Sequence, residues 1–179
     1  LLCNKLSQDW LLKNTLKTKY NAKILTNAWL KMYEILSTFP LLTKNQKCFH
    51  ICEAPGAFIS SSQHYAKLNN IELEWYAQSL ISDEALGDHY NLMQDYSYRW
   101  IIPDNGDITK TSTLKYYLND TRLESLDFLT SDAGMQIPAN KINQQEKIMA
   151  ELNLSQIIYA LTLLKVNGNC VLKTFLPFL

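Results

Sequence analysis

Glu53-Ala54-Pro55-Gly56-Ala57-Phe58 is the stretch that decides the fold. It follows a short apolar run at residues 48–52 and precedes a segment of helical character at residues 58–68. A strand, a glycine turn and a helix in this order form the layout of a nucleotide-type binding loop. Gly56 lets the backbone come close to a ligand, and the start of the helix offers free N–H groups. One glycine falls short of the triple-glycine dinucleotide fingerprint, so the loop alone also suits an ordinary turn.

Strands and helices alternate along the chain. Strands are predicted at residues 48–52, 73–80, 99–102, 126–130 and 171–175. Helices are predicted at residues 27–36, 58–68, 109–118 and 143–165, the last ended by Asn167-Gly168. This alternation indicates parallel crossover units, and therefore an α/β fold with a mostly parallel central sheet and helices on both faces. Ligands of such sheets bind beyond the carboxyl ends of the strands.

Functional residue types stand at several of these strand ends. Gly56, Ser79, Asp107 and Asp132 come just after predicted strands, and Lys173 lies inside the last one. Lysine is rarely buried, so its place in an apolar strand indicates a function. Asp107 also suits the simpler task of closing the turn that precedes it.

The composition is that of one globular domain with a formal net charge of zero. Zero charge argues against a strongly basic coat for nucleic acid. Lysines nevertheless outnumber acidic residues in the N-terminal quarter, which suits either RNA phosphates or a solvated helix face. These lysines are Lys5, Lys13, Lys17, Lys19, Lys23, Lys31, Lys44 and Lys47. We expect a basic helical extension at residues 1–26 and the main domain at residues 27–179, truncated at its C-terminal end.

The chain contains four cysteines, which is too few for a disulfide scaffold at this length. Cys48, His50 and Cys52 alternate on a predicted strand, but a closed zinc site needs a fourth ligand, so we expect no metal. No signal peptide is visible, and the apolar run at residues 157–164 is too short to span a bilayer. These features predict a soluble intracellular protein of the cytoplasm or nucleus, with no membrane partner.

Seven segments carry a family resemblance. They are AWLKMYEIL (28–36), ICEAPGAFI (51–59), HY (64–65), WYAQSL (75–80), DNGDI (104–108), SDAG (131–134) and VLK (171–173). In this order they resemble the FtsJ/RrmJ-type ribose 2′-O-methyltransferases, and within them the adrift-type cap methyltransferases. The resemblance implies a Rossmann-like methyltransferase fold, S-adenosylmethionine as cofactor and a ribose 2′-hydroxyl of capped mRNA or another RNA as acceptor.

The resemblance also implies site residues. Lys31, Asp132 and Lys173 match the first three members of the family's Lys-Asp-Lys-Glu tetrad, whose glutamate is expected after Leu179. The residues expected to bind the cofactor are Glu53, Gly56, Ala57, Phe58, Trp75, Ser79, Asp107 and Asp132. Asp107 would bind the adenine amine and Asp132 would lie near the methionine end. Ser79 or Gln78 stands where the family has a polar partner for the ribose. Core packing is the alternative role for Phe58 and Trp75.

Lysine chemistry fits this reaction. A neutral lysine amine can take the proton of a ribose hydroxyl as the methyl group moves, and burial beside a second cation favours the neutral amine. Lys173 would be the base, with Lys31 as the neighbouring cation and Asp132 as the positioning group. Most of the catalysis should come from holding the acceptor oxygen in line with the methyl group.

Two other functions compete with this interpretation. A methyltransferase-like domain without activity, binding RNA or a partner protein, stays open because the fourth tetrad residue is missing. A nicotinamide dehydrogenase is disfavoured by the absent glycine fingerprint. Ser131-Asp132-Ala133-Gly134 replaces the Asn/Asp-Pro-Pro-aromatic motif of amino methyltransferases, which favours oxygen as the acceptor. Additional domains or a helper subunit are left open, and a viral source would place the protein in the host cytoplasm or the virion.

Overall fold

A four-stranded parallel sheet forms the centre of the computed structural model, which describes residues 2–82, 87–134 and 137–174. The strands are β1 (Gln46–Ile51), β2 (Leu73–Ala77), β3 (Leu126–Ser131) and β4 (Leu164–Leu172). They lie in the order β2-β1-β3-β4, and each neighbouring pair is parallel. The predicted strand at residues 99–102 is reduced to one parallel bridge between Ala77 and Trp100.

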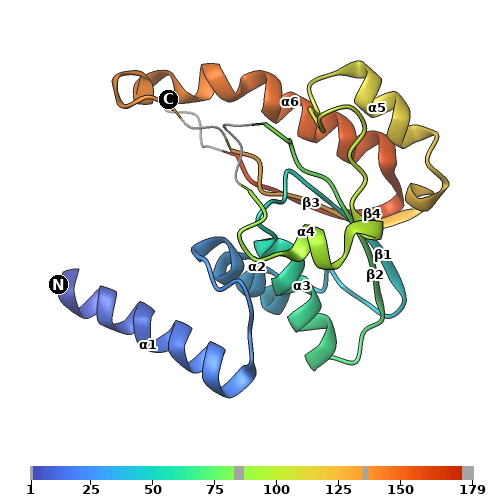
Figure 1. Cartoon of the computed structure of the whole chain (residues 1–179). Helices are drawn as coiled ribbons and strands as arrows, with labels where there is room; N and C mark the ends of the chain where they lie inside the picture. The colour runs from blue at the N-terminus through green and yellow to red at the C-terminus, as the bar shows by residue number, and fades with distance from the viewer. Residues whose placement is uncertain (1, 83–86, 135–136, 175–179) are drawn as a thin grey trace.

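Helices cover both faces of this sheet (Figure 1). They are α1 (Leu2–Tyr20), α2 (Asn27–Thr38), α3 (Ala57–Leu68), α4 (Leu92–Asp95), α5 (Thr111–Leu118) and α6 (Gln145–Leu163). Short 3₁₀ turns lie at Ser97–Arg99, Thr121–Leu123 and Ala139–Gln144. In Figure 1, α5 and α6 lie on one side of the sheet, whereas α2, α3 and α4 lie on the other. The predicted parallel α/β architecture with helices on both faces is therefore confirmed.

Side chains that alternate along β1 point into two separate hydrophobic clusters, one on each face of the sheet. Phe49 and Ile51 are fully buried in a cluster with Tyr117 of α5 and Tyr159 of α6. Cys48, the residue before Phe49, is buried in a second cluster with Met32 of α2 and with residues of α3. Successive strand residues point to opposite faces, so a strand covered on both sides must be apolar at nearly every position. This explains why the sequence at residues 48–52 is apolar at nearly every position, with His50 as the exception.

The N-terminal helix α1 extends away from the body of the molecule (Figure 1). Its contact with the domain comes at its C-terminal end, where Leu16 packs against a small cluster that contains Ala22 and Trp29. Lys13 Nζ also donates a hydrogen bond to Asn27 Oδ1 over 2.7 Å. The predicted basic segment at residues 1–26 thus contains a helix whose C-terminal part meets the domain beside α2.

The boundary between the last helix and the last strand was predicted wrongly. α6 ends at Leu163, and β4 starts at the next residue because Leu164 pairs with Leu126 of β3. Asn167-Gly168, predicted as the helix C-terminal signal, lies inside β4 where the register shifts. Asn167 has a φ of 66°, so the Asn-Gly pair does turn the chain, but within a strand irregularity. Residue 175 of the predicted strand lies outside the described residues.

The misplaced boundary has a physical cause. α6 buries Met149, Tyr159 and Leu163 against the sheet, and its outer face is also apolar. The exposed apolar residues of that face are Leu154, Ile157, Ile158 and Leu161. A helix that is apolar on both faces gives no periodic signal that could mark its last turn. Pairing with β3 decides where it stops.

Replacing Thr26 with alanine is expected to lower the free energy of unfolding by about 1 kcal/mol. Thr26 is the N-cap of α2, and its Oγ1 accepts a hydrogen bond from the Trp29 N–H over 3.2 Å. Chemical denaturation measures the change. Thr38→Ala is the matched control, since that exposed hydroxyl donates to Glu34 O at the other end of α2 and its loss should stay within about 0.5 kcal/mol. Equal losses in the two variants would contradict the cap.

Candidate functional site at the carboxyl edge of the sheet

The pairing register of the parallel strands places the candidate residues along one edge of the sheet. Ile51 of β1 is level with Ser131 of β3, and Ser131 is level with Leu172 of β4. Lys173 N–H donates to Ser131 O over 2.9 Å, so the pairing continues one residue beyond β4. The residues that directly follow these three strands therefore meet at the edge where ligands of parallel sheets bind.

Lys173 and Asp132 form an ion pair at this edge. Lys173 Nζ lies 2.7 Å from Asp132 Oδ1 and 3.1 Å from the Asp132 carbonyl oxygen. Both side chains are partly buried, with 38% and 23% of their surface exposed. A Cβ added at Gly134 would lie 3.3 Å from the same ammonium nitrogen, so the loop after β3 passes close beside it. The structure thus brings together two of the three predicted catalytic residues.

Lys31 is placed differently. It lies on the exposed side of α2, whose buried face carries Trp29, Met32 and Leu36. Within the described part of the chain, Lys173 pairs with Asp132, and no hydrogen bond or ion pair joins Lys31 to either. A position beside Lys173 stays a prediction for Lys31.

The Glu53 carboxylate caps α3. Its Oε1 accepts hydrogen bonds from Phe58 N–H over 2.5 Å and from Ile59 N–H over 3.1 Å. We expected the free N–H groups at the start of α3 to bind a ligand, but the Glu53 side chain already accepts hydrogen bonds from two of them. Glu53 is 2% exposed, and its Oε2 has no partner among the described residues. Burial raises the pKa of this carboxyl well above 4.5, and the nearby Asp132 charge adds to the rise.

Gly56 is required for reasons that include packing within the chain. Its φ of 105° lies in the left-handed region, and its N–H donates to Glu53 O over 2.5 Å. A Cβ at this position would collide with Leu92 Cδ2 of α4. The peptide bond before Pro55 is cis. The glycine therefore allows both the turn into α3 and the close approach of α4.

The predicted cofactor residues with apolar side chains are buried in the domain. Ala57 and Phe58 at the start of α3 are 4% and 5% exposed, and Trp75 of β2 is 4% exposed. Phe58 and Trp75 share a core cluster, and Arg99 lies 5.2 Å from the centre of the Trp75 ring. Their side chains pack as core residues, which was the alternative role for Phe58 and Trp75, so contact with a cofactor stays a prediction.

The polar residues after β2 and after the Trp100 bridge already have partners. Ser79 Oγ accepts a hydrogen bond from Ala54 N–H over 3.2 Å, which ties the end of β2 to the loop between β1 and α3. Asp107 Oδ1 accepts from the N–H and the hydroxyl of Thr109, over 3.0 and 2.7 Å. Asp107 thus holds the turn that follows it, and not the Asn105-Gly106 turn that the simpler role named. Its second carboxylate oxygen is offered to another partner.

Sequence reasoning missed the central role of Gln78. This residue is fully buried, and its amide hydrogen-bonds with the main chain of Cys52 and of Gly106. The sequence had offered Gln78 as an alternative partner for a ribose, but both polar atoms of its side chain are engaged within the protein. A glutamine at the end of a strand carries no sequence signal for this bridging role.

The side chains of Cys48, His50 and Cys52 do not come together in the arrangement of a metal site. His50 is fully buried, and its Nδ1 lies 2.7 Å from Thr130 Oγ1. Burial lowers the pKa of the His50 imidazole to about 3. Among the described residues no group of three His, Cys, Asp or Glu side chains is arranged to hold a metal ion.

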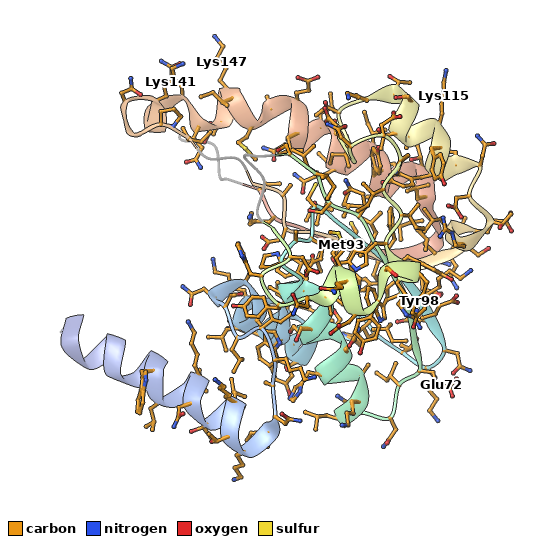
Figure 2. The ribbon with its side chains drawn as sticks, in the orientation of Figure 1. Glu72, Met93, Tyr98, Lys115, Lys141 and Lys147 are labelled. Carbon is orange, nitrogen blue, oxygen red and sulfur yellow. The ribbon has the colours of Figure 1, made fainter. Side chains whose placement is uncertain are left out.

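Two surface hollows lie away from this edge. One is lined by α5 and the following turn, including Lys115 and Asp120, and the other by residues at the amino ends of the strands, including Glu72 and Asp127. Lys115 and Glu72 are labelled in Figure 2. We place the candidate site at the carboxyl edge because ligands of parallel sheets bind there and because Lys173 and Asp132 meet there.

No helix in the parts of the chain that the structure describes combines the length and apolarity needed to cross a membrane.

Comparison with known proteins points to one family. Residues 24–177 match the family profile described as FtsJ-like methyltransferase. An uncharacterized protein of Acanthamoeba polyphaga mimivirus is 43% identical over 176 residues, covering 93% of this chain and 22% of that protein. The cap-specific mRNA (nucleoside-2′-O-)-methyltransferase 2 of Danio rerio is 32% identical over 180 residues, covering 91% of this chain and 24% of that protein.

The likeness extends to a solved structure. A crystal structure of a Plasmodium falciparum protein, named as a ribosomal RNA methyltransferase, matches with a TM-score of 0.53 and 18% sequence identity. The match covers 86% of this chain and 79% of that one. At this identity the likeness shows the fold alone. The chain spans about a quarter of the length of the two curated relatives named above, 22% and 24%.

Glu53→Gln is expected to change how stability depends on pH. Because the folded-state pKa of Glu53 is raised above 4.5, the folded chain keeps a proton that the unfolded chain releases above that pH. The contribution of Glu53 to the free energy of unfolding should therefore fall as pH rises from 4.5 toward neutrality, whereas His50, whose pKa is lowered, acts in the opposite direction in both proteins. Glutamine does not titrate and still accepts both α3 N–H groups, so the stability of the variant relative to the wild type should increase over this range.

Urea denaturation at several pH values measures the difference between the two proteins. Glu72→Gln, at an exposed glutamate, is the control and should follow the wild-type profile. Profiles of identical shape for the wild type and Glu53→Gln would contradict a buried, protonated Glu53.

Proposed function

Since the chain belongs to the FtsJ-like methyltransferase family, we propose that it transfers a methyl group from S-adenosylmethionine to a ribose 2′-hydroxyl of RNA. We further propose that the acceptor is the cap-proximal nucleotide of mRNA. The observation that carries the proposal is the ion pair of Lys173 and Asp132 at the carboxyl edge of the sheet. The name of the Danio rerio relative, a cap-specific mRNA (nucleoside-2′-O-)-methyltransferase, supports the choice of acceptor.

The carboxyl groups at this edge suit S-adenosylmethionine, which a methyltransferase family implies in general. The cofactor presents an ammonium group, ribose hydroxyls and an adenine amine, all hydrogen-bond donors. Asp107 and Asp132 offer carboxylate oxygens, and Glu53 Oε2 is a buried oxygen without a partner among the described residues. We propose Asp107 for the adenine amine and Asp132 for the methionine end. The bound cofactor supplies an electrophilic methyl group.

Lys173 is the proposed general base. Its Nζ, as a neutral amine that has first released its own proton, would take the hydroxyl proton while the ribose oxygen gains the methyl group and the bond from that methyl group to the sulfonium sulfur breaks. Asp132 fixes the position of Nζ through the 2.7 Å contact with Oδ1. Lys31 is the proposed neighbouring cation that favours the neutral amine. Positioning of the acceptor oxygen against the methyl group supplies most of the rate.

RNA is proposed to enter along the basic N-terminal quarter. Lys17, Lys19 and Lys23 are exposed, and Lys13 is partly exposed beside α2. These residues lie on or just after α1, the helix that extends from the domain (Figure 1). Lysine ammonium groups on such an element can follow an RNA backbone without base recognition.

Lys173→Met is expected to abolish methyl transfer and to leave affinity for S-adenosylmethionine within about twofold, because the amine acts on the acceptor hydroxyl. Lys173→Arg should fail equally, since a guanidinium does not release its proton near neutral pH. Activity is measured on capped RNA in the full-length protein by analysis of the first nucleotide, and cofactor binding by calorimetry.

The matched control is Lys165→Met. Lys165 lies in β4, and like Lys173 it forms an ion pair with an aspartate, Asp127 of β3, but toward the other end of the sheet. This variant should keep its activity. Near-normal activity of Lys173→Arg would show that position 173 supplies charge or shape and not a base. A domain without activity would instead bind the cofactor in the wild type and transfer no methyl group.

Charge reversal of Lys13, Lys17, Lys19 and Lys23 to glutamate is expected to weaken RNA binding and its salt dependence. Each lost phosphate contact should lower the slope of log K against log salt by about 0.7 for single-stranded RNA. Binding is measured by fluorescence anisotropy across a salt series. Lys115→Glu together with Lys147→Glu, on α5 and α6 (Figure 2), is the control and should leave the slope unchanged. An unchanged slope in the N-terminal variant would rule out this path.

A further inference from the structure

We infer that Gln78 is a positioning residue of the cofactor site: it holds the turn at residues 104–107 against the ends of β1 and β2, and so aims Asp107 at the ligand. The inference rests on the proposed function, because it assumes that the carboxyl edge binds S-adenosylmethionine. It assigns to Gln78 a task that neither its residue type nor its place in the sequence indicates.

The side chain of Gln78 joins two segments that are distant in sequence. Its Oε1 accepts a hydrogen bond from Cys52 N–H over 2.9 Å, at the end of β1. Its Nε2 donates to the carbonyl oxygen of Gly106. The amide lies in a fully buried position, where both bonds are sheltered from water.

The main chain of Gln78 makes two further hydrogen bonds, both to residues at or just after the end of β1. Gln78 N–H donates to His50 O over 2.8 Å, and Gln78 O accepts from Glu53 N–H over 3.1 Å. The residue therefore ties the end of β1, the end of β2 and the turn before Asp107 into one unit. Each of these segments carries at least one proposed cofactor residue.

The turn itself is packed tightly against this unit. Gly106 has a φ of 75°, and a Cβ there would collide with Ser79 O and lie 2.9 Å from Gln78 Nε2. Ile81 N–H also donates to Asn105 O over 2.7 Å. Asp107 directly follows, so the position of its carboxylate depends on where Gln78 holds Gly106.

An amide meets both requirements at this position without titrating. Cys52 N–H can only donate and Gly106 O can only accept, so the side chain must offer an acceptor and a donor together. Methionine or leucine would leave both main-chain groups without their partner. This also fixes the orientation of the amide.

Selectivity for the adenine amine provides the test. The probes are S-adenosylhomocysteine and S-inosylhomocysteine, which has an oxygen in place of the adenine amine that Asp107 is proposed to bind. In the wild type we expect roughly tenfold preference for the adenine form, since a site built to bind a donor leaves its acceptor unpaired with the analogue. In Gln78→Met this preference should fall toward unity, because the turn no longer aims Asp107.

Calorimetry with both probes measures the preference, and thermal unfolding reports on the fold. Gln156→Met is the matched control: Gln156 is another fully buried glutamine, whose Nε2 donates to Asn153 on its own helix. It should keep the wild-type preference even if stability falls. Gln78→Leu is the second variant in case Gln78→Met does not fold, and the same loss of preference is expected because leucine also lacks both polar groups.

The double variant Gln78→Met with Asp107→Asn separates positioning from general destabilisation. If Gln78 acts through Asp107, the loss of affinity in the double variant should equal that of the larger single variant. Additive losses, or equal weakening of both probes by Gln78→Met, would overturn the inference and leave the proposed function standing. Failure of the wild type to bind S-adenosylhomocysteine would overturn the proposed function itself.

Discussion

The parallel pairing of β1 with β2 on one side and with β3 on the other is the constraint on which the rest of the structure depends. Parallel strands end at the same edge, so this pairing brings together residues that follow strands far apart in sequence. The continued pairing of β4 with β3 carries Lys173 to the level of Asp132. Without that register the ion pair between these residues could not form.

Most polar groups at this edge serve the fold before they serve a ligand. Glu53 caps α3, Ser79 accepts from Ala54, and Asp107 holds the turn that follows it. A buried polar group without a partner is costly, so loops that gather at one edge tend to satisfy one another. What remains for a ligand is the second oxygen of Asp107, the partly exposed pair of Lys173 and Asp132, and the buried Oε2 of Glu53.

Glycine illustrates how the local and the long-range requirements combine. Gly56 was expected to admit a ligand, and its positive φ does suit the turn into α3. The space beside it is nevertheless filled by Leu92 from α4, more than thirty residues later in the chain. Gly106 is similar, because its missing Cβ leaves room for the carbonyl oxygen of Ser79. Both glycines were found from the sequence, but their neighbours depend on loop packing that has no local signal.

The sequence by itself determined the order of strands and helices, the class of sheet and the family motifs, because hydrophobic periodicity and turn residues are local properties. The family motifs also grouped Asp132 with Lys173, but the sequence placed Lys173 inside a strand, and it lies at the edge beside Asp132 because β4 ends at Leu172. Tertiary structure alone decided that α6 ends at Leu163, because pairing of Leu164 with Leu126 overrides a helix whose exposed face also carries apolar residues near its C-terminal end. It alone decided that Lys31 lies exposed and that Gln78 joins three loops. These outcomes depend on which groups meet across the fold, and the partners of a side chain are not encoded in its neighbours along the chain.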